Sequence, residues 1–201
     1  MRRRSGNNIT FNDMLFNILL GFVVLFVIAF LLINPITKRN DIPAKVELMI
    51  VVEWEDRSLS DIDIWVQYND VNPTGFNNRE SNGINLERDD LGQQNDKIVV
   101  DGETILVYSN REVVNIRGVM PGDYYINLHS YSFRDNKPLV VKVTVIDINP
   151  TYREAYTLEY EFVDRNSIHR PPAFTVDPEG HIVDIFAHTR TIVPVRRNLQ
   201  Q

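Results

Sequence analysis

Residues 11–17 read Phe-Asn-Asp-Met-Leu-Phe-Asn, and an apolar run follows them without a break to residue 33. Together with Met14–Asn17 it makes a segment, Met14 to Ile33, of roughly the 20 residues that an α-helix needs to cross the hydrocarbon core of a bilayer. Asn17 is its one strongly polar side chain. A helix can span lipid because it satisfies its own backbone hydrogen bonds. We therefore predict a transmembrane helix over residues 11–34.

Asp13 stands at the start of this span, where an ionisable side chain is costly unless it faces protein or water. Its position alone leaves two interpretations open: a functional site, or an N-cap or interfacial residue at the helix start. Asn17 and Gly21 follow at intervals of four residues, so all three share one helix face. Such a polar and small strip lets water or a partner helix approach, although ordinary helix packing uses the same residues.

The segment from Phe11 to Phe26 resembles the membrane helix of the MotB/ExbD/TolR family, the B subunits of proton-driven motors and stators, including MotB-like subunits of a defence system. In that family an aromatic residue, a small or polar residue, Asp and Met open a helix that continues as a Phe/Val/Leu run. The resemblance covers about residues 9–33. It implies that Asp13 carries the coupling proton, that the chain forms a homodimer, and that a multi-span channel subunit of the MotA/ExbB/TolQ kind surrounds it.

Three arginines at positions 2–4 precede the span, and Lys38 and Arg39 follow it. Basic flanks stay in the cytoplasm, so this asymmetry favours a cytoplasmic N-terminus and a periplasmic C-terminal domain on the bacterial inner membrane. We expect residues 1–10 to form a short basic cytoplasmic tail and residues 35–44 a linker. A secretory signal peptide is the competing assignment, but its apolar core is normally shorter and no small-x-small cleavage site follows here.

The charge of the chain divides unevenly along its length. The first 40 residues carry a net charge of +4 and the remainder −10, which gives −6 for the 201 residues. An acidic outer domain argues against nucleic acid as a partner. The chain has no Cys, which excludes disulfides, thiolate metal sites and a Cys nucleophile.

Residues 45–195 carry strand signals separated by turns, which predicts an all-β sandwich or jelly roll, with a tail over 196–201. Residues 69–96 are polar and rich in Asn and Gly, so we expect mostly loop there. No part of this region has a helical period of useful length. The expected strands cover residues 46–54, 62–68, 97–100, 104–108, 113–117, 124–131, 139–146, 156–163 and 182–192.

Part of this domain also resembles β-sandwich modules of the pre-peptidase C-terminal type. Ser60-Asp61-Ile62-Asp63-Ile64-Trp65-Val66 is similar to their Asp-x-Asp strand, and Met120-Pro121-Gly122-Asp123-Tyr124 to their later Pro-Gly-x-Tyr strand. The OmpA-like peptidoglycan-binding signature of flagellar stators is absent from the sequence, which argues against anchoring to the cell wall by that route.

Four acids of the outer domain, Asp61, Asp63, Asp89 and Asp90, offer oxygen ligands of the kind that Ca²⁺ takes. Their spacing is not that of an EF-hand, so the sequence favours a solvated acidic loop, with no metal centre expected and Ca²⁺ as the alternative. The four histidines lack zinc-ligand spacing, and no nucleophile elbow is present, so we expect no enzyme activity and no cofactor.

These observations support one functional hypothesis and one alternative. The chain is expected to be an inner-membrane subunit of a complex driven by the proton-motive force, with the β domain acting on an unknown envelope target. A single helix cannot enclose a proton path, so this hypothesis requires the multi-span partner. The alternative is a membrane-anchored β-sandwich binding module without ion transport.

Overall fold

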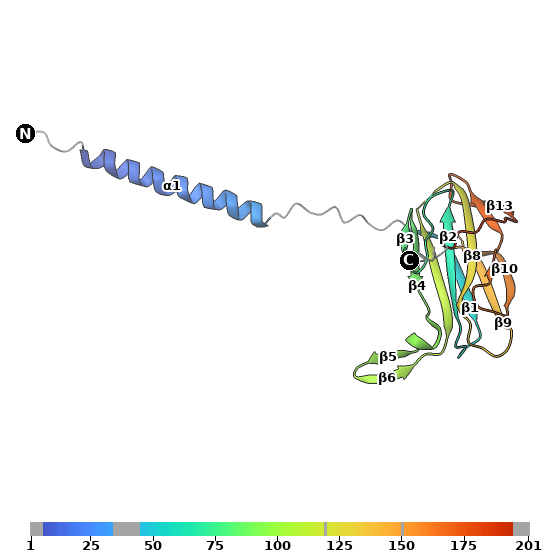
Figure 1. Cartoon of the computed structure of the whole chain (residues 1–201). Helices are drawn as coiled ribbons and strands as arrows, with labels where there is room; N and C mark the ends of the chain where they lie inside the picture. Colours follow the sequence, from blue (N-terminus) through green and yellow to red (C-terminus); the bar gives the residue numbers. More distant parts are fainter. Residues whose placement is uncertain (1–5, 34–44, 119, 150, 195–201) are drawn as a thin grey trace, which may run out of the picture. The chain divides into compact units, whose positions relative to one another are not determined.

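The computed structural model describes residues 6–33, 45–118, 120–149 and 151–194. They belong to two compact units, Met1–Ile42 and Pro43–Gln201. The described part of the first unit is one helix, α1 (Gly6–Ile33), and that of the second is built of strands with a short 3-10 helix, η1 (Gly92–Asn95) (Figure 1). This arrangement confirms the predicted fold class, a single N-terminal helix followed by an all-β domain. The expected linker over 35–44 and tail over 196–201 lie outside the described residues.

Helix α1 begins at Gly6, ahead of the expected start at residue 11, so residues 6–10 of the expected tail are helical. Asp13 therefore lies about two turns inside the helix, and its interpretation as an N-cap is wrong. The 21 residues of Thr10–Phe30 have a mean hydropathy of 2.5 and are long and apolar enough to cross a membrane. Their side chains are exposed around the whole circumference, which suits contact with lipid.

The larger sheet of the β unit has six antiparallel strands in the order β10-β9-β1-β7-β4-β3. Strands β9 and β10 pair as an antiparallel hairpin. The strands of this sheet are β1 (Val46–Trp54), β3 (Glu80–Ser81), β4 (Ile84–Arg88), β7 (Asn110–Arg117), β9 (Leu139–Asp147) and β10 (Arg153–Phe162).

The second sheet is organised around the long strand β8 (Gly122–Ser132). Strand β2 (Asp61–Tyr68) pairs along one edge of β8, while β11 (Ile168–His169) and β12 (Ala173–Val176) pair with its other edge. Strand β13 (Ile182–Phe186) continues the sheet beyond β12. Strand β2 is thus an edge strand of this sheet, and the candidate site is built on it.

The core lies between the two sheets and follows the alternation of the strands. On β1, every second side chain from Leu48 to Trp54 is 5% exposed or less. Tyr124 of β8 stacks on Phe174 of β12 with ring centroids 5.2 Å apart. Each fully buried aliphatic or aromatic side chain of this kind contributes about 1.5–3 kcal/mol by leaving water.

The structure refines three expectations about the strands. Residues 69–96 are mostly turn and loop, as expected, but they also contain β4, a full member of the larger sheet that buries Ile84 and Leu86. Strand β12 is absent from the expected set. The last strand ends at Phe186 rather than near residue 192. Near residue 192 the backbone bonds a side chain instead of a strand: Asn127 accepts a hydrogen bond from Ile192 N and donates one to Arg190 O.

Strands β5 (Lys97–Val100) and β6 (Glu103–Leu106) form a separate two-stranded hairpin, which projects away from both sheets (Figure 1). Asp101 and Gly102 at its tip have φ of 53° and 85°, as a two-residue turn between right-twisted strands requires. All of its residues are exposed, including the apolar ones, so the hairpin adds nothing to the core.

Candidate functional site

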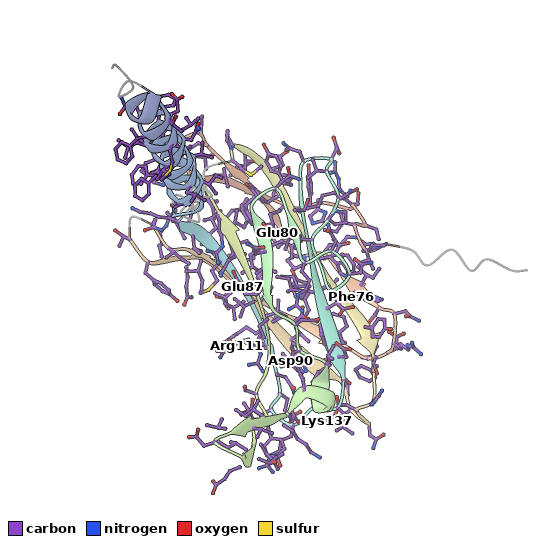
Figure 2. The ribbon with its side chains drawn as sticks, turned by 90° about the vertical axis from the view of Figure 1, so that its left-hand side faces the viewer. Phe76, Glu80, Glu87, Asp90, Arg111 and Lys137 are labelled. Carbon is purple, nitrogen blue, oxygen red and sulfur yellow. The ribbon has the colours of Figure 1, made fainter. Side chains whose placement is uncertain are left out.

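Both faces of β2 are buried, which is unusual for an edge strand. Ile62, Ile64 and Val66 point into the core, and the alternate residues Asp61, Asp63 and Trp65 point to the other face of the sheet, with exposures of 5%, 3% and 1%. The segment after β2 covers this outer face: Phe76 meets the Trp65 ring edge-on at 5.4 Å between centroids, and Figure 2 shows Phe76 beside β2. Two carboxylates and an indole are therefore enclosed outside the main core.

Four carboxyl groups gather at this edge of β2: Asp61, Asp63, Asp89 and Glu112, which we call the acidic cluster. One oxygen each from Asp63, Asp89 and Glu112 lies within 4.8 Å of the others. Asp61, Asp63 and Asp89 also line a cavity of about 140 Å³, together with Phe76, Leu91 and Tyr131.

Glu112 reaches the cluster from the larger sheet. It lies in the buried row of β7 with Val114 and Ile116, and it is 1% exposed. The Ile64 N–H on the free edge of β2 donates a hydrogen bond to Glu112 Oε2 at 2.5 Å. Glu112 thus takes the place of a neighbouring strand at this point of β2, and it connects the two sheets.

Burial dominates the electrostatics of the cluster. It raises the pKa of Asp61 to about 7, with the charges of Asp63 and Asp89 adding to the effect. Burial also raises the pKa of Glu112 well above its ordinary value, and that of Asp63 less, because His129 stabilises the Asp63 carboxylate. Strand pairing places His129 directly opposite Asp63, with Nδ1 3.4 Å from Oδ2.

Three oxygens of the cluster are buried without a hydrogen-bond donor among the described residues: Glu112 Oε1, Asp61 Oδ1 and Asp89 Oδ1. The Arg79 guanidinium lies 3.9 Å from the other oxygen of Asp89. Buried polar atoms are nearly always paired in native proteins, so three orphaned acceptors in one place indicate a missing positive or proton-donating group.

The structure separates the four acids that the sequence singled out. Asp61, Asp63 and Asp89 come together, whereas Asp90 organises its own loop. Asp90 accepts hydrogen bonds from Gly92 N, from Arg88 Nη2 and from Arg111 N, and it is 1% exposed (Figure 2). The prediction of a solvated acidic loop is wrong, because Asp61 and Asp63 are buried on a strand.

Sequence reasoning missed Glu112 altogether. The signal that could have found it is an acid within the alternating strand Asn110–Arg117, at a position in phase with the apolar residues Val114 and Ile116. An acid that occupies a core-facing position of a strand requires a partner, and here that partner is the edge of β2.

A larger cavity of about 440 Å³ adjoins the acidic cluster, and we call it the aromatic pocket. It shares Phe76 and Tyr131 with the smaller cavity, and His129 lines it while contacting Asp63. Trp65 Nε1 lies nearby, buried without an acceptor among the described residues. A pocket with an apolar floor and a few polar groups is suited to a small organic ligand. Its principal lining residues are Trp65, Phe76, His129, Tyr131, Arg165 and Val193.

The other residues singled out from the sequence lie elsewhere. Asp13, Asn17 and Gly21 follow one another along α1, all exposed, and a Cβ added at Gly21 would meet nothing within 4 Å. Two of the histidines cap backbone carbonyls: His169 Nε2 lies 3.0 Å from Glu161 O, and His188 Nε2 lies 3.0 Å from Pro171 O.

Comparison of the chain with models of known protein families, with curated proteins and with solved structures gives no match.

Proposed function

We propose that this chain is a single-span subunit of a proton-driven complex in the bacterial inner membrane, with Asp13 as the proton carrier. One observation carries the proposal: Asp13 is the lone Asp, Glu, Lys or Arg between Thr10 and Phe30, and it lies inside a continuous helix. An ionisable group within a membrane span is costly, and such groups characteristically line ion pathways or proton relays.

The surroundings of Asp13 on α1 fit this role. Asn17 and Gly21 lie one and two turns further along the same face, where the helix is otherwise apolar. A small and polar strip allows close approach of a second helix, and it gives the acid a route out of contact with lipid. The proposed complex contains two copies of this chain and a multi-span channel subunit, which together shield the carboxyl group.

The orientation follows from the basic residues. Arg2, Arg3 and Arg4 precede the span, so the N-terminus is cytoplasmic and the β unit lies in the periplasm, where it acts on an envelope target. In this arrangement a protonation cycle at Asp13 drives movement of α1, and the β unit transmits or anchors that movement.

The test is proton uptake by the complex in liposomes. The chain is purified with its co-purifying membrane partner, reconstituted around a pH-sensitive dye, and driven by an imposed membrane potential. Asp13→Asn should abolish uptake while co-purification persists, because the amide keeps the shape of the side chain but cannot be deprotonated. Asn12→Ala, one residue away, should retain uptake. Equal uptake by the Asp13→Asn complex would refute the proposal.

The aromatic pocket favours a second candidate, a membrane-anchored binding module without ion transport. A cavity of about 440 Å³ is large enough to hold a small organic ligand. This candidate predicts that no multi-span subunit co-purifies with the chain. It also predicts that Asp13→Asn is neutral in cells, whereas Phe76→Ala, which removes a pocket wall, abolishes function.

A further inference from the structure

The acidic cluster concentrates negative charge where the protein provides little to balance it. Asp61, Asp63 and Glu112 are each 5% exposed or less. Arg79, 3.9 Å from Asp89, is itself half exposed to water, and His129 is neutral unless protonated. Proteins keep buried carboxylates by pairing them, by protonating them or by giving them a metal ion. The arrangement of the oxygens decides between these solutions.

The hydrogen bonds within the described residues leave the cluster only partly satisfied. Glu112 Oε1 and Asp61 Oδ1 have no donor there, and their nearest charged neighbours in the cluster are other carboxylates, which are also acceptors when ionised. A shared proton could satisfy one pair of oxygens at most. A cation at the centre would balance the charge of the three carboxylates that lie together, Asp63, Asp89 and Glu112.

The spacing of the oxygens fits one ion. Ca²⁺ binds oxygen at about 2.3–2.6 Å, so two ligands on opposite sides of it lie roughly 5 Å apart or closer. The oxygens of Asp63, Asp89 and Glu112 all lie within 4.8 Å of one another, which meets this limit. Mg²⁺ loses its waters reluctantly and is usually held by one or two carboxylates, so a cluster of three carboxylates favours Ca²⁺.

The chemistry of the donors points the same way. All of the ligands are hard carboxylate oxygens, the chain contains no Cys, and the His129 nitrogen that faces the cluster is directed at Asp63. Ca²⁺ needs six to eight ligands, so waters must complete its shell. The adjoining cavity of about 140 Å³ offers room for several of them, since a water occupies roughly 30 Å³ in the liquid.

We infer that Asp63, Asp89 and Glu112 form a binding site for one Ca²⁺ ion, with Asp61 as a further ligand or as acceptor for a bound water. The ion joins β2 of one sheet to β7 of the other and to the segment that follows β4. Because Asp63 also holds His129, the ion fixes one wall of the aromatic pocket.

Calorimetric titration of the full chain in detergent micelles, after removal of metal with a chelator, tests this inference. We expect one Ca²⁺ per chain with Kd between roughly 1 μM and 1 mM, the range of sensor and extracellular sites. Mg²⁺ should bind at least about tenfold more weakly, because it gives up its waters reluctantly and is seldom held by three protein carboxylates. Comparable affinity for Mg²⁺ would overturn the assignment of Ca²⁺.

Two variants locate the ion. Glu112→Gln removes a negative charge but keeps an oxygen that can accept the hydrogen bond from Ile64 N. Asp89→Asn removes a negative charge at the more exposed side of the cluster. Each should weaken Ca²⁺ binding by about tenfold or more. The matched control is Glu87→Gln on β4, an exposed acid that pairs with Arg117 and lies outside the cluster; it should change Kd less than twofold.

The outcomes that overturn the inference are equally definite. The inference is wrong if the folded wild-type chain shows no saturable Ca²⁺ binding at millimolar concentrations. It is also wrong if both cluster variants bind Ca²⁺ with wild-type affinity, because the ion would then lie elsewhere. Circular dichroism establishes that each variant is folded, and if Glu112→Gln does not fold, Asp89→Asn alone decides the location.

Discussion

Gly75→Ala should destabilise the β unit, because this glycine lies against the face of Trp65. A Cβ built at position 75 would lie 2.4 Å from Trp65 Cε3 and 2.6 Å from Cδ2, where atoms in folded proteins do not approach. A shift of the indole would disturb buried packing, since Trp65 is 1% exposed and Phe76 packs on its edge. Overpacking of this kind costs about 1–3 kcal/mol.

The assay is thermal unfolding of the full chain, followed by circular dichroism in the strand region. For a domain of this size each kcal/mol lowers Tm by roughly 2–4 °C, so we expect a decrease of about 2–12 °C. Gly21→Ala is the matched control, because a Cβ there meets nothing within 4 Å and the residue lies on α1. An unchanged Tm in Gly75→Ala would refute the close packing of this segment on β2.

Three further results are expected. Addition of Ca²⁺ to 100 times the wild-type Kd should stabilise the wild-type chain by about 2.7 kcal/mol, which a chelator reverses, whereas Glu112→Gln, which binds Ca²⁺ about tenfold more weakly or worse, should gain at most about 1.4 kcal/mol at the same concentration. Replacement of residues 97–106 by a short Gly-Ser turn should leave Tm within about 2 °C of wild type, because the hairpin is exposed and Val107 N bonds Asp96 O at 2.8 Å across its base. Burial tends to raise the pKa of Asp135, but hydrogen bonds from two serine hydroxyls outweigh it and hold this pKa below its ordinary value. Since the folded pKa is the lower one, Asp135 stabilises the fold above about pH 4, and the difference in Tm from Asp135→Asn should shrink as pH falls through the folded pKa.

The sequence predicted the elements whose signals are local. A long apolar run is sufficient to identify α1, and strands such as β1 and β9 have a regular alternation of buried residues. Strand β4 escaped notice because Ile84 and Leu86 are separated by a single Asn within a polar, Asn-rich region. Strand β4 belongs to the sheet because it pairs with β7, and no local sequence pattern predicts that pairing.

The candidate site illustrates the same distinction. The Asp-x-Asp spacing on β2 directed attention to Asp61 and Asp63, and alternation explains why both point to one face. The sequence could not separate Asp89 from Asp90, because adjacent acids differ only in what surrounds them after folding. Glu112 joins the cluster across 49 residues from Asp63 through the contact between sheets, and that contact is a property of the tertiary structure.

The most direct measurement of the central claim is chemical labelling of Asp13 by a hydrophobic carbodiimide in native membranes. Such reagents partition into lipid and modify a carboxyl group in its protonated form, and mass spectrometry locates the adduct. Proton uptake shows that protons move, whereas labelling shows which carboxyl group carries them. We expect the adduct on Asp13, with a yield that falls as the pH rises, and none at this position in Asp13→Asn. A chain that stays unmodified at Asp13 over the whole pH range, while other membrane carboxyl groups react, would contradict the account.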